Sequence, residues 1–328
     1  MEREYIGIDL HKAFFQGCAL TPTGERQWEQ RWPTTDDGIA GLLTRCGPHT
    51  WLAVEASSPT WAFVDRIVER VGAVHVVDAR KTRLKAGYAA KTDRLDARRL
   101  ADALRRESVV GIYYPPPAIR DLRELGRYRC HLSRLQASLK QRIQALLLRH
   151  GVVVPVKGLF TARGTAWLET VTLPGWAGTS LAGLRQVVTD VREQLVPVVA
   201  AIRATAATDP IARALDARPG FGPVFSVTLR AEIGMISRFP DGPHLASYAG
   251  LVPRVERSAT RAWSGRITKA GSPWMRWALV EAALHQFRRQ DDFGQWARRL
   301  AMRKGVLKAR VAVARALCDE LFAAWPRS

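Results

Sequence analysis

Short apolar runs separated by polar turns fill the first hundred residues, and this pattern predicts a sheet with covering helices. Three consecutive strands are predicted over residues 4–9, 13–20 and 25–32, with a turn at 21–24 before the third. Two later apolar runs predict strands over 51–55 and 74–77. Helices are predicted over 36–43, 59–71, 80–88 and 93–106.

The order of these elements is three strands, then a helix, a strand, a helix, a strand and further helices. This is the order of an α/β RNase H-like (RuvC-like) fold. In that fold the first and fourth strands are neighbours, so their ends meet, and a later helix packs across them. Residues 1–112 are therefore predicted to form an RNase H-like domain.

Four carboxylates occupy the positions where such a fold would bring side chains together. Asp9 ends the apolar run at 5–8, and Glu55 ends the run at 51–54. Asp93 and Asp96 are three residues apart on a predicted helix, so both can face one point. Carboxylates crowded at buried strand ends repel one another unless a cation joins them.

Hard oxygen ligands of this kind suit Mg²⁺ or Mn²⁺ rather than zinc. Two such ions about 4 Å apart can hold the attacking and leaving oxygens of a phosphodiester. Taken singly, Asp9 and Glu55 have a plainer interpretation, as strand-end acids that cap nearby backbone groups. The four acids together favour a metal-dependent enzyme that acts on nucleic acid.

A different pattern follows the proline-rich stretch at 113–117, which is predicted to be a linker. Apolar residues at three- and four-residue steps predict a long amphipathic helix over 118–150. A second helix over 180–207 is predicted to pair with it as an antiparallel coiled coil. The apolar stripe fits packing within the chain or a seam between subunits, and residues 113–210 are assigned to this linker and helical segment.

Residues 211–328 are predicted to form a mostly α-helical C-terminal domain. Gly220 and Gly222 lie in a turn at 219–223 between two predicted helices, where free backbone N–H groups can bind phosphate as in helix-hairpin-helix proteins. A simple Gly-Pro turn is the alternative. Residues 253–271 lack a period and are predicted to be a functional loop rich in arginine and hydroxyl groups. A helix over 273–289 and one or two basic helices to residue 325 follow.

The charge of the chain rises along its length. The whole protein has 50 basic and 30 acidic side chains, a net charge of +20 and a pI near 10.8, which favours a polyanionic partner. Residues 1–110 hold 17 basic and 15 acidic groups, whereas residues 211–328 hold 20 and 9. The four scattered cysteines suggest neither zinc nor disulfides, and no apolar run resembles a signal peptide or a membrane span, so a bacterial cytoplasmic location is expected.

These residues together resemble a known family, the DEDD transposases of bacterial insertion sequences, which are bridge-RNA-guided DNA recombinases. The resemblance covers nearly the whole chain and depends on six stretches in this order: YIGIDLHK at 5–12, VEA at 54–56, KTDRLDA at 91–97, PGFGP at 219–223, YAGLVPR at 248–254 and GRITKAG at 265–271.

The resemblance implies a RuvC-like domain in which Asp9, Glu55, Asp93 and Asp96 hold the metal, and a C-terminal transposase domain with a nucleophilic serine. Ser258 matches the place of that serine, although this chain has Arg257-Ser258-Ala259 where the family has Ser-Ser-Gly. Ser264 is the fallback nucleophile. It further implies target and donor DNA, a structured guide RNA, and a homo-oligomer, dimer to tetramer, as partners.

Because no histidine lies in the serine region, we expect the metal-bound acids of the same or another subunit to activate Ser258. Basic side chains would hold nucleic acid around it: Arg254, Arg257, Arg261, Arg266 and Lys269. Two other functions stay open. A hydrolytic junction resolvase would use the acids and water, without a covalent serine adduct, and a non-catalytic nucleic-acid-binding protein would need only the basic helices.

Overall fold

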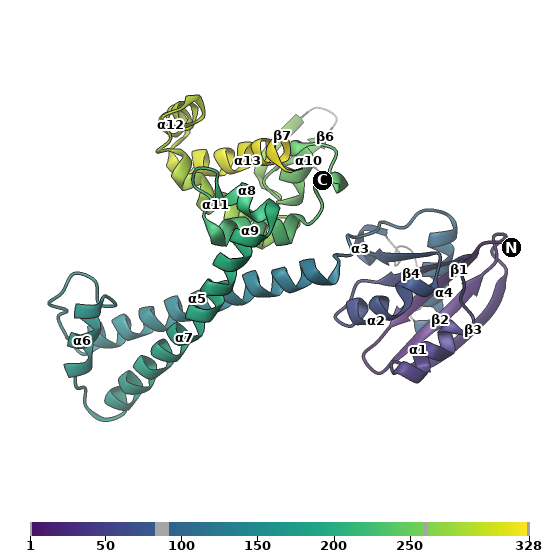
Figure 1. The fold of residues 1–328 in the computed structure, drawn as a ribbon, viewed down its shortest axis with the longest axis horizontal. Coiled ribbons are helices and arrows are strands. Elements are labelled where there is room, and N and C mark those ends of the chain that lie inside the picture. The colour runs from purple at the N-terminus through teal and green to yellow at the C-terminus, as the bar shows by residue number, and fades with distance from the viewer. Residues whose placement is uncertain (1, 83–91, 259–260, 327–328) are drawn as a thin grey trace. The chain divides into compact units, whose positions relative to one another are not determined.

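The computed structural model describes residues 2–82, 92–258 and 261–326 of the chain (Figure 1). The chain divides into two compact units, residues 1–114 and residues 115–328. The first unit contains a sheet with helices, and within the described ranges the second is largely helical. The predicted change of character near residue 113 is thus visible, whereas the further boundary at residue 210 stays a prediction.

A five-stranded mixed sheet forms the centre of the first unit, with the strand order β3-β2-β1-β4-β5. Its strands are β1 (Glu4–Leu10), β2 (Phe14–Leu20), β3 (Arg26–Pro33), β4 (Thr50–Glu55) and β5 (Ala73–Val77). The first three strands pair antiparallel as a meander, whereas β4 is parallel to both β1 and β5. The predicted mixed sheet is confirmed, and this topology is compatible with an RNase H-like fold.

Four α-helices accompany the sheet in the described part of the first unit: α1 (Asp36–Leu43), α2 (Thr60–Ile67), α3 (Ala79–Thr82) and α4 (Asp93–Arg105). Each predicted strand starts or ends within one residue of the observed one. The helix predicted over 59–71 ends early, because a 3₁₀ turn, η1 (Val68–Arg70), follows α2. Most of the helix predicted over 80–88 falls on residues 83–88, which lie outside the described residues.

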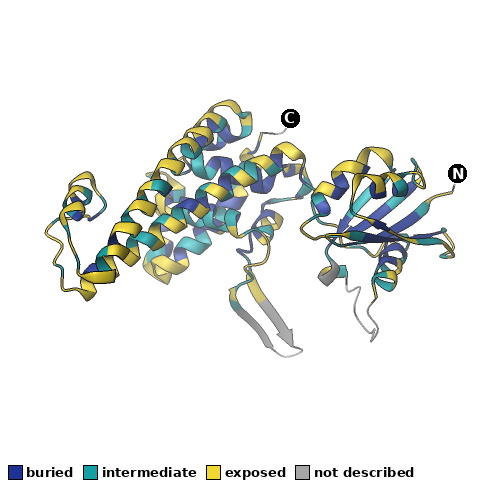
Figure 2. Cartoon of the chain, turned by 90° about the horizontal axis from the view of Figure 1, so that it is seen from below, coloured by how far each residue is buried: buried dark blue, intermediate teal, exposed yellow. Residues whose placement is uncertain are grey.

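Side-chain alternation gives the sheet two apolar faces. Ile6, Ile8, Leu52 and Val54 pack with side chains of α1 and α2 on one face. Tyr5 and Ala53 lie on the opposite face, where they pack with Leu100 and Leu104 of α4. The strands β1, β2 and β4 are accordingly the most buried strands of this sheet (Figure 2). Since successive residues of a strand point to opposite faces, Asp9 and Glu55 belong to the face that α4 covers.

Two long helices begin the second unit, α5 (Pro117–Arg149) and α7 (Gly175–Thr208), with the short helix α6 (Ala162–Thr170) between them. The two long helices pack side by side, and Figure 1 shows them as one extended hairpin with α6 at its far end. Tyr128 donates a hydrogen bond to Gln194 across the pair, 2.9 Å long. Both predicted helices are present, and α7 starts five residues before the expected start at 180.

Helices also form most of the remaining core: α8 (Pro210–Asp216), α9 (Pro223–Ile233), α10 (Gly242–Tyr248), α11 (Pro273–Gln286), α12 (Asp292–Lys304) and α13 (Val306–Ala324), with a 3₁₀ turn, η2 (Ile236–Arg238). Their buried apolar side chains form one large cluster. Within it, α11 contacts α9 and α13, and α10 also packs on α13. The predicted mostly helical C-terminal region is therefore confirmed.

Within the described residues, most of the stretch at 253–271 consists of two strands, so the prediction of a loop was wrong there. Its chain forms an antiparallel pair, β6 (Pro253–Ser258) and β7 (Arg261–Ile267). The register of the pair shifts between Pro253 and Val255. Such a shift disturbs the regular pairing of a strand, and most residues of β6 are polar, so the sequence pattern was weak.

A buried carboxylate joins three helices of the second unit. Glu232 of α9 is 3 % exposed and accepts two hydrogen bonds from Arg127 of α5, 2.9 and 3.1 Å long. It also accepts a 2.9 Å hydrogen bond from Ser272, the N-cap residue of α11. Because an unpaired buried charge is costly, this set of bonds fixes the start of α5 against the C-terminal core.

In the part of the chain that the structure describes, no single helix has the length and apolar composition to cross a membrane. Only the bent pair of α7 and α8 meets those two criteria jointly.

Candidate active site

Two predicted acids lie at the ends of adjacent parallel strands. The register of β1 and β4 pairs Ile8 with Val54, and one further step along both strands brings Asp9 beside Glu55. Both residues are half-buried on the face that α4 covers. The sheet register therefore positions these two carboxylates without help from a loop.

The other two predicted acids occupy the first turn of α4. The helix starts after Thr92, whose side chain accepts a hydrogen bond from the Leu95 N–H. Such a cap fixes the first turn, and the helix dipole favours carboxylates there. The Asp96 side chain is 15 % exposed and that of Asp93 is 40 % exposed.

Close packing of α4 on β1 depends on Gly7. A Cβ atom at Gly7 would lie 2.1 Å from the Ala97 carbonyl oxygen and 2.4 Å from the Ala101 nitrogen. No side chain fits there without moving the helix, so glycine is needed for this close approach. Two residues further along β1, Asp9 then lies near the start of the same helix.

His11 joins the acids into a cluster. Its Nε2 atom lies 3.2 Å from Asp9 Oδ2 and 3.4 Å from Asp93 Oδ1. One potential ligand atom from each of Asp9, His11 and Asp93 lies within 4.8 Å of the other two. Among the described residues, these three form a group that could hold a metal ion. The sequence analysis assigned no role to His11.

Burial is the main reason why the pKa of Asp9 is raised above its ordinary value. His11 acts in the opposite direction through its charge and hydrogen bond, while the negative charges of Asp93 and Asp96 raise the pKa further. The folded protein thus holds a carboxylate that is short of positive charge. A divalent cation would supply that charge, so the donor set fits a hard metal ion such as Mg²⁺ or Mn²⁺.

Two arginines partly offset the remaining negative charge. Arg31 Nη2 of β3 lies 2.9 Å from Asp93 Oδ2, and Arg99 Nη1 of α4 lies 3.0 Å from Asp96 Oδ1. The carboxylate of Glu55, by contrast, makes no hydrogen bond or ion pair with another described side chain. Only its backbone carbonyl accepts a bond, from Thr60. Glu55 is therefore placed near the cluster by sheet register but is not joined to it.

The predicted nucleophile lies at the other end of the sequence, in the β6–β7 hairpin. Ser258 is the last residue of β6 and pairs through its backbone with Arg261. The side chains of Ser258, Ser264, Arg257 and Arg261 lie outside the described residues. Arg254, Arg266 and Lys269 are exposed, and Lys269 has a positive φ of 54° in the turn after β7.

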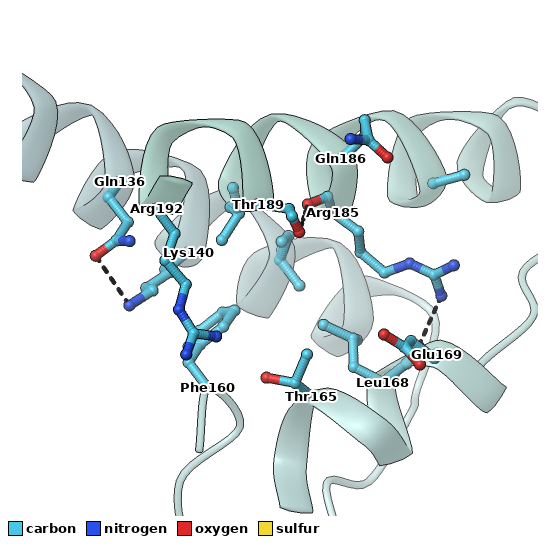
Figure 3. Close-up of a pocket in the computed structure, with 13 residues that line it drawn as sticks. Gln136, Lys140, Phe160, Thr165, Leu168, Glu169, Arg185, Gln186, Thr189 and Arg192 are labelled. Carbon is cyan, nitrogen blue, oxygen red and sulfur yellow. Dashed lines mark hydrogen bonds between the residues drawn. The ribbon is translucent and has the colours of Figure 1, made fainter. Parts of the chain in front are cut away.

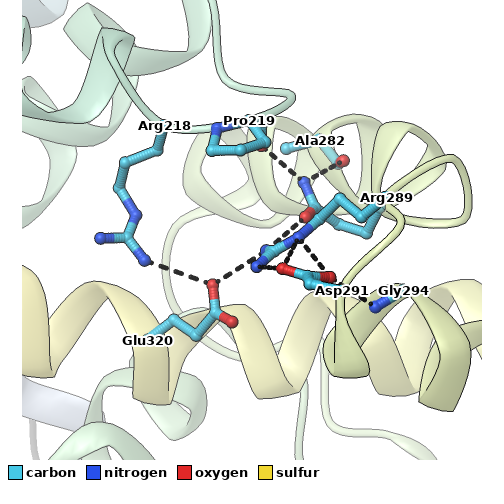
Figure 4. Close-up of polar contacts among 8 residues, drawn as sticks. Arg218, Pro219, Ala282, Arg289, Asp291, Gly294 and Glu320 are labelled. Carbon is cyan, nitrogen blue, oxygen red and sulfur yellow. Dashed lines mark hydrogen bonds and ion pairs between the residues drawn. The ribbon is translucent and has the colours of Figure 1, made fainter.

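The glycine-rich turn at 219–223 lies between α8 and α9, and side chains from α11 and α13 hold it from below (Figure 4). Gln286 donates hydrogen bonds to the carbonyls of Pro219, 2.9 Å, and Ala282, 3.1 Å. Arg289 donates to Gln286, and Glu320 accepts from both Arg289 and Arg218.

Both glycines of this turn have positive φ angles, 84° at Gly220 and 52° at Gly222. A Cβ atom on Gly220 would lie 2.6 Å from Gln286 Nε2, so the turn could not rest on α11 with a larger residue. Gly222 is followed directly by the N-terminus of α9. Phosphate binding by this turn remains a prediction.

Comparisons with known proteins give this arrangement a family. Residues 212–298 match the family described as "Transposase IS116/IS110/IS902 family", and residues 6–151 match the DEDD transposase domain of the IS110 type. The matched segments contain the acids and the hairpin, and together they span more than half of the chain. The chain belongs to this transposase family.

Three relatives illustrate how far the similarity extends. A putative transposase of Sinorhizobium fredii, y4qE, is 28% identical over 85% of this chain and 70% of its own length. The transposase for insertion sequence element IS1111A of Coxiella burnetii is 24% identical over 94% of this chain and 86% of its own. A probable family 20 transposase of Pseudomonas aeruginosa is 26% identical over 68% of this chain and 69% of its own.

Family membership gives the site a chemical context. An insertion-sequence transposase binds and cuts DNA, and the DEDD class uses divalent metal. In this transposase the structure brings Asp9, Asp93 and Asp96 together, and it adds His11, Arg31 and Arg99. His11 follows Asp9 by two residues, a spacing that points both side chains to one side of a strand, so that spacing was a usable indication. Nothing local pairs Arg31 with Asp93, because 62 residues separate them.

Proposed function

We propose that this transposase cuts and rejoins DNA through a covalent serine–DNA intermediate, with a divalent metal ion held by the acidic cluster. The observation that carries the metal part of the proposal is the convergence of Asp9 and Asp93 on His11, on the sheet face covered by α4. The serine part is supported by the family and by the place of Ser258 in the sequence. Metal-binding carboxylates are expected to be partly buried and to have too little positive charge around them before the cation binds.

Asp9, Glu55, Asp93 and Asp96 would hold Mg²⁺ or Mn²⁺. A bound ion of this kind stabilises the negative charge that develops on phosphodiester oxygens during displacement. Arg31 and Arg99 would keep the carboxylates of Asp93 and Asp96 in position through the ion pairs described above. His11, in contact with two of the acids, would orient them.

Ser258 would act as the nucleophile. Its oxygen gives up the hydroxyl proton and forms a bond to the phosphorus of a DNA phosphodiester, the bond from phosphorus to a deoxyribose oxygen breaks, and that oxygen takes up a proton. A hydroxyl group of the exchanged strand then attacks the phosphoserine, which restores the serine and reseals the DNA without hydrolysis. Arg254, Arg257, Arg261 and Arg266 would bind the transferred phosphate. Ser264 is the alternative nucleophile.

A structured guide RNA would choose the DNA, and a dimer to tetramer would hold the strands for exchange. The net charge of +20 supports extensive phosphate contacts, and no compact base-reading motif is present in the sequence. Backbone N–H groups around Gly220 and Gly222, together with Lys269, would contribute contacts to the nucleic-acid backbone.

The test uses purified protein, the RNA encoded beside its element, labelled target and donor DNA, and Mg²⁺. Products are run on a denaturing gel before and after protease treatment. We expect a protease-sensitive protein–DNA adduct with the wild type and with Ser264→Ala, and no adduct with Ser258→Ala. A protein–DNA adduct that still forms with Ser258→Ala would show that Ser258 is not the nucleophile.

A hydrolytic nuclease is the second candidate, because the acidic cluster alone provides what water-mediated cleavage needs. It predicts nicked strands with free ends and no adduct, at a rate that Ser258→Ala leaves unchanged. The non-catalytic alternative predicts salt-sensitive binding without cleavage, unaffected by loss of the acids.

A further inference from the structure

A pocket of about 660 Å³ lies between α5, α6 and α7 in the second unit (Figure 3). The two long helices form one wall, and the stretch from Phe160 to Glu169, which includes α6, forms the other. The pocket contains none of the residues assigned above to the acidic cluster, the hairpin or the glycine-rich turn. Its volume falls in the range of about 300–1,000 Å³ that is usual for ligand sites.

Three cations line this pocket, and the fold does not neutralise them. Lys140 Nζ donates to the neutral side chain of Gln136, 3.2 Å away, and Arg185 Nη1 donates to the Leu168 carbonyl, 2.8 Å away. Neither these two side chains nor Arg192 pairs with a carboxylate among the described residues. A surplus of positive charge in a partly enclosed polar site favours an anion.

The lining is divided by chemistry. In Figure 3, Lys140 and Arg192 lie on the same side as Phe160, whereas Arg185 reaches towards Glu169. The Lys140 ammonium lies 5.2 Å from the centre of the Phe160 ring. One side of the pocket thus combines two cations with an aromatic ring, and the carboxylate on the other side would repel an anion.

We propose that this pocket binds an unpaired nucleotide of a nucleic-acid strand. Its phosphate would lie between Lys140 and Arg192, and its base would pack against the apolar wall of Phe160 and Leu168. Paired cations match a phosphodiester, and aromatic rings accept any base by its face. The inference goes beyond the proposed function, since it assigns no role in bond breaking to these residues.

Free phosphate or a free nucleotide has the same chemistry, but two observations favour a strand. Arg192 and Thr189 are exposed, so the pocket is accessible to a chain that passes along α7. The surrounding helices add more positive charge, because residues 111–210 contain 13 basic and 6 acidic side chains. A continuous strand gains from all of these charges, whereas a single nucleotide uses only those inside the pocket.

The test measures binding of the full-length protein to fluorescent oligothymidylate of about 12 nucleotides, long enough for a typical single-strand site. Fluorescence anisotropy is recorded in EDTA, so that DNA cleavage does not contribute. The double variant Lys140→Gln/Arg192→Gln is compared with Arg149→Gln/Arg203→Gln. The control removes the same charge from the same two helices at exposed positions outside the pocket.

We expect the pocket variant to weaken binding about tenfold and to reduce the salt dependence by about one phosphate contact or more, while the control weakens it less than about threefold. Phe160→Leu keeps an apolar side chain in the wall, yet should weaken binding about fivefold because the stacking surface is lost. Equal losses in the two double variants would overturn the proposal. Displacement of the strand by thymidine monophosphate at equal nucleotide concentration would overturn it in favour of a free-nucleotide site.

These outcomes are independent of the serine pathway. A pocket variant that binds normally would refute the nucleotide site even if the serine adduct forms. An absent adduct would refute the serine pathway and leave the binding result unchanged.

Discussion

The acidic cluster and the serine hairpin show two different ways of placing functional side chains. Asp9 lies one residue before the end of β1, Glu55 ends the neighbouring strand β4, and Asp93 begins a helix that packs against that sheet. Ser258 instead ends a strand of an isolated two-stranded hairpin with arginines along it. The acids are held by packing from several sides, so their position is a property of the fold. The hairpin presents its residues from a single pair of strands.

The difference concerns the two proposed tasks. Metal ligands need a fixed spacing, because a small ion tolerates little variation in its ligand positions. The proposed nucleophile, by contrast, lies at the end of a strand with a single neighbouring strand. The following changes test how strictly each region depends on its surroundings.

The largest effect is expected from Asp9→Asn. The amide keeps the shape of the side chain but removes the charge at the centre of the cluster, so strand cleavage should fall about a thousandfold, or about 4 kcal/mol in activation free energy. Single-turnover cleavage of labelled DNA measures this rate. Asp102→Asn, on the same helix as Asp93 but paired with Arg105 and Arg106, should cleave at nearly the normal rate. Equal losses in the two variants would show that the cluster has no special role.

The next largest effect is expected on the stability of the second unit, where Glu232 joins three helices. Glu232→Ala leaves Arg127 and Ser272 without their buried partner, and we expect a loss of about 3–4 kcal/mol in the free energy of unfolding. Urea denaturation measures it. Glu281→Ala breaks a more exposed pair with Arg310, 2.8 Å long, and should cost less than about 1 kcal/mol. Similar values for the two variants would mean that Glu232 does not anchor α5.

A smaller effect is expected from Gly7→Val, because the new side chain must push α4 away from β1. Overpacking of this kind costs about 2–3 kcal/mol in stability. Cleavage should fall further than the loss of folded protein explains, since the start of α4 holds Asp93 and Asp96. Gly47→Ala is the control, because a Cβ atom at that position meets no atom within 4 Å. Normal cleavage by folded Gly7→Val would show that the cluster tolerates movement of the helix.

The smallest effect is a gain in stability. Burial raises the pKa of Asp9, so the Asp9 carboxyl group binds its proton more tightly in the folded protein than in the unfolded chain. The stability of the folded protein therefore declines as the pH rises through the raised pKa. At neutral pH and without metal, Asp9→Asn should therefore increase the free energy of unfolding by less than about 1 kcal/mol. The unfolding temperature should rise slightly. Added Mg²⁺ should stabilise the wild type but not this variant.

Asp102 supplies a control of opposite sign for the same calorimetric experiment. Partial burial acts to raise its pKa, but hydrogen bonds and charges from Arg105 and Arg106 lower it overall. Its contribution to stability is present at neutral pH and is lost as the pH falls through the lowered pKa. Asp102→Asn should accordingly lower the unfolding temperature. If the unfolding temperature fell in both variants, the charge on Asp9 would not destabilise the metal-free fold, and the account would be contradicted.

The first unit was largely predictable from the sequence because its strands are short, apolar and well bounded. The apolar runs at 5–8 and 51–54 also placed Asp9 and Glu55 near strand ends. The contact of Arg31 with Asp93 was not predictable, since it depends on how β3 and α4 pack and 62 residues separate the two.

The hairpin at 253–267 shows the opposite case. Both strands contain several polar residues and the register of their pairing shifts, so no clear alternation marked it as a sheet. The pocket beside Phe160 was also hidden, because α5 and α7 bring Lys140 and Arg192 together from positions 52 residues apart. The packing of the two long helices creates this pocket, and local sequence patterns do not predict how the helices pack.

The most direct test of the account is titration of Mn²⁺ followed by electron paramagnetic resonance, with the wild type, Asp9→Asn and Asp102→Asn. The account predicts that the wild type and Asp102→Asn bind the ion alike, whereas Asp9→Asn binds it at least about tenfold more weakly, about 1.4 kcal/mol. Mn²⁺ affinity that Asp9→Asn leaves unchanged would contradict the assignment of this cluster as the metal site.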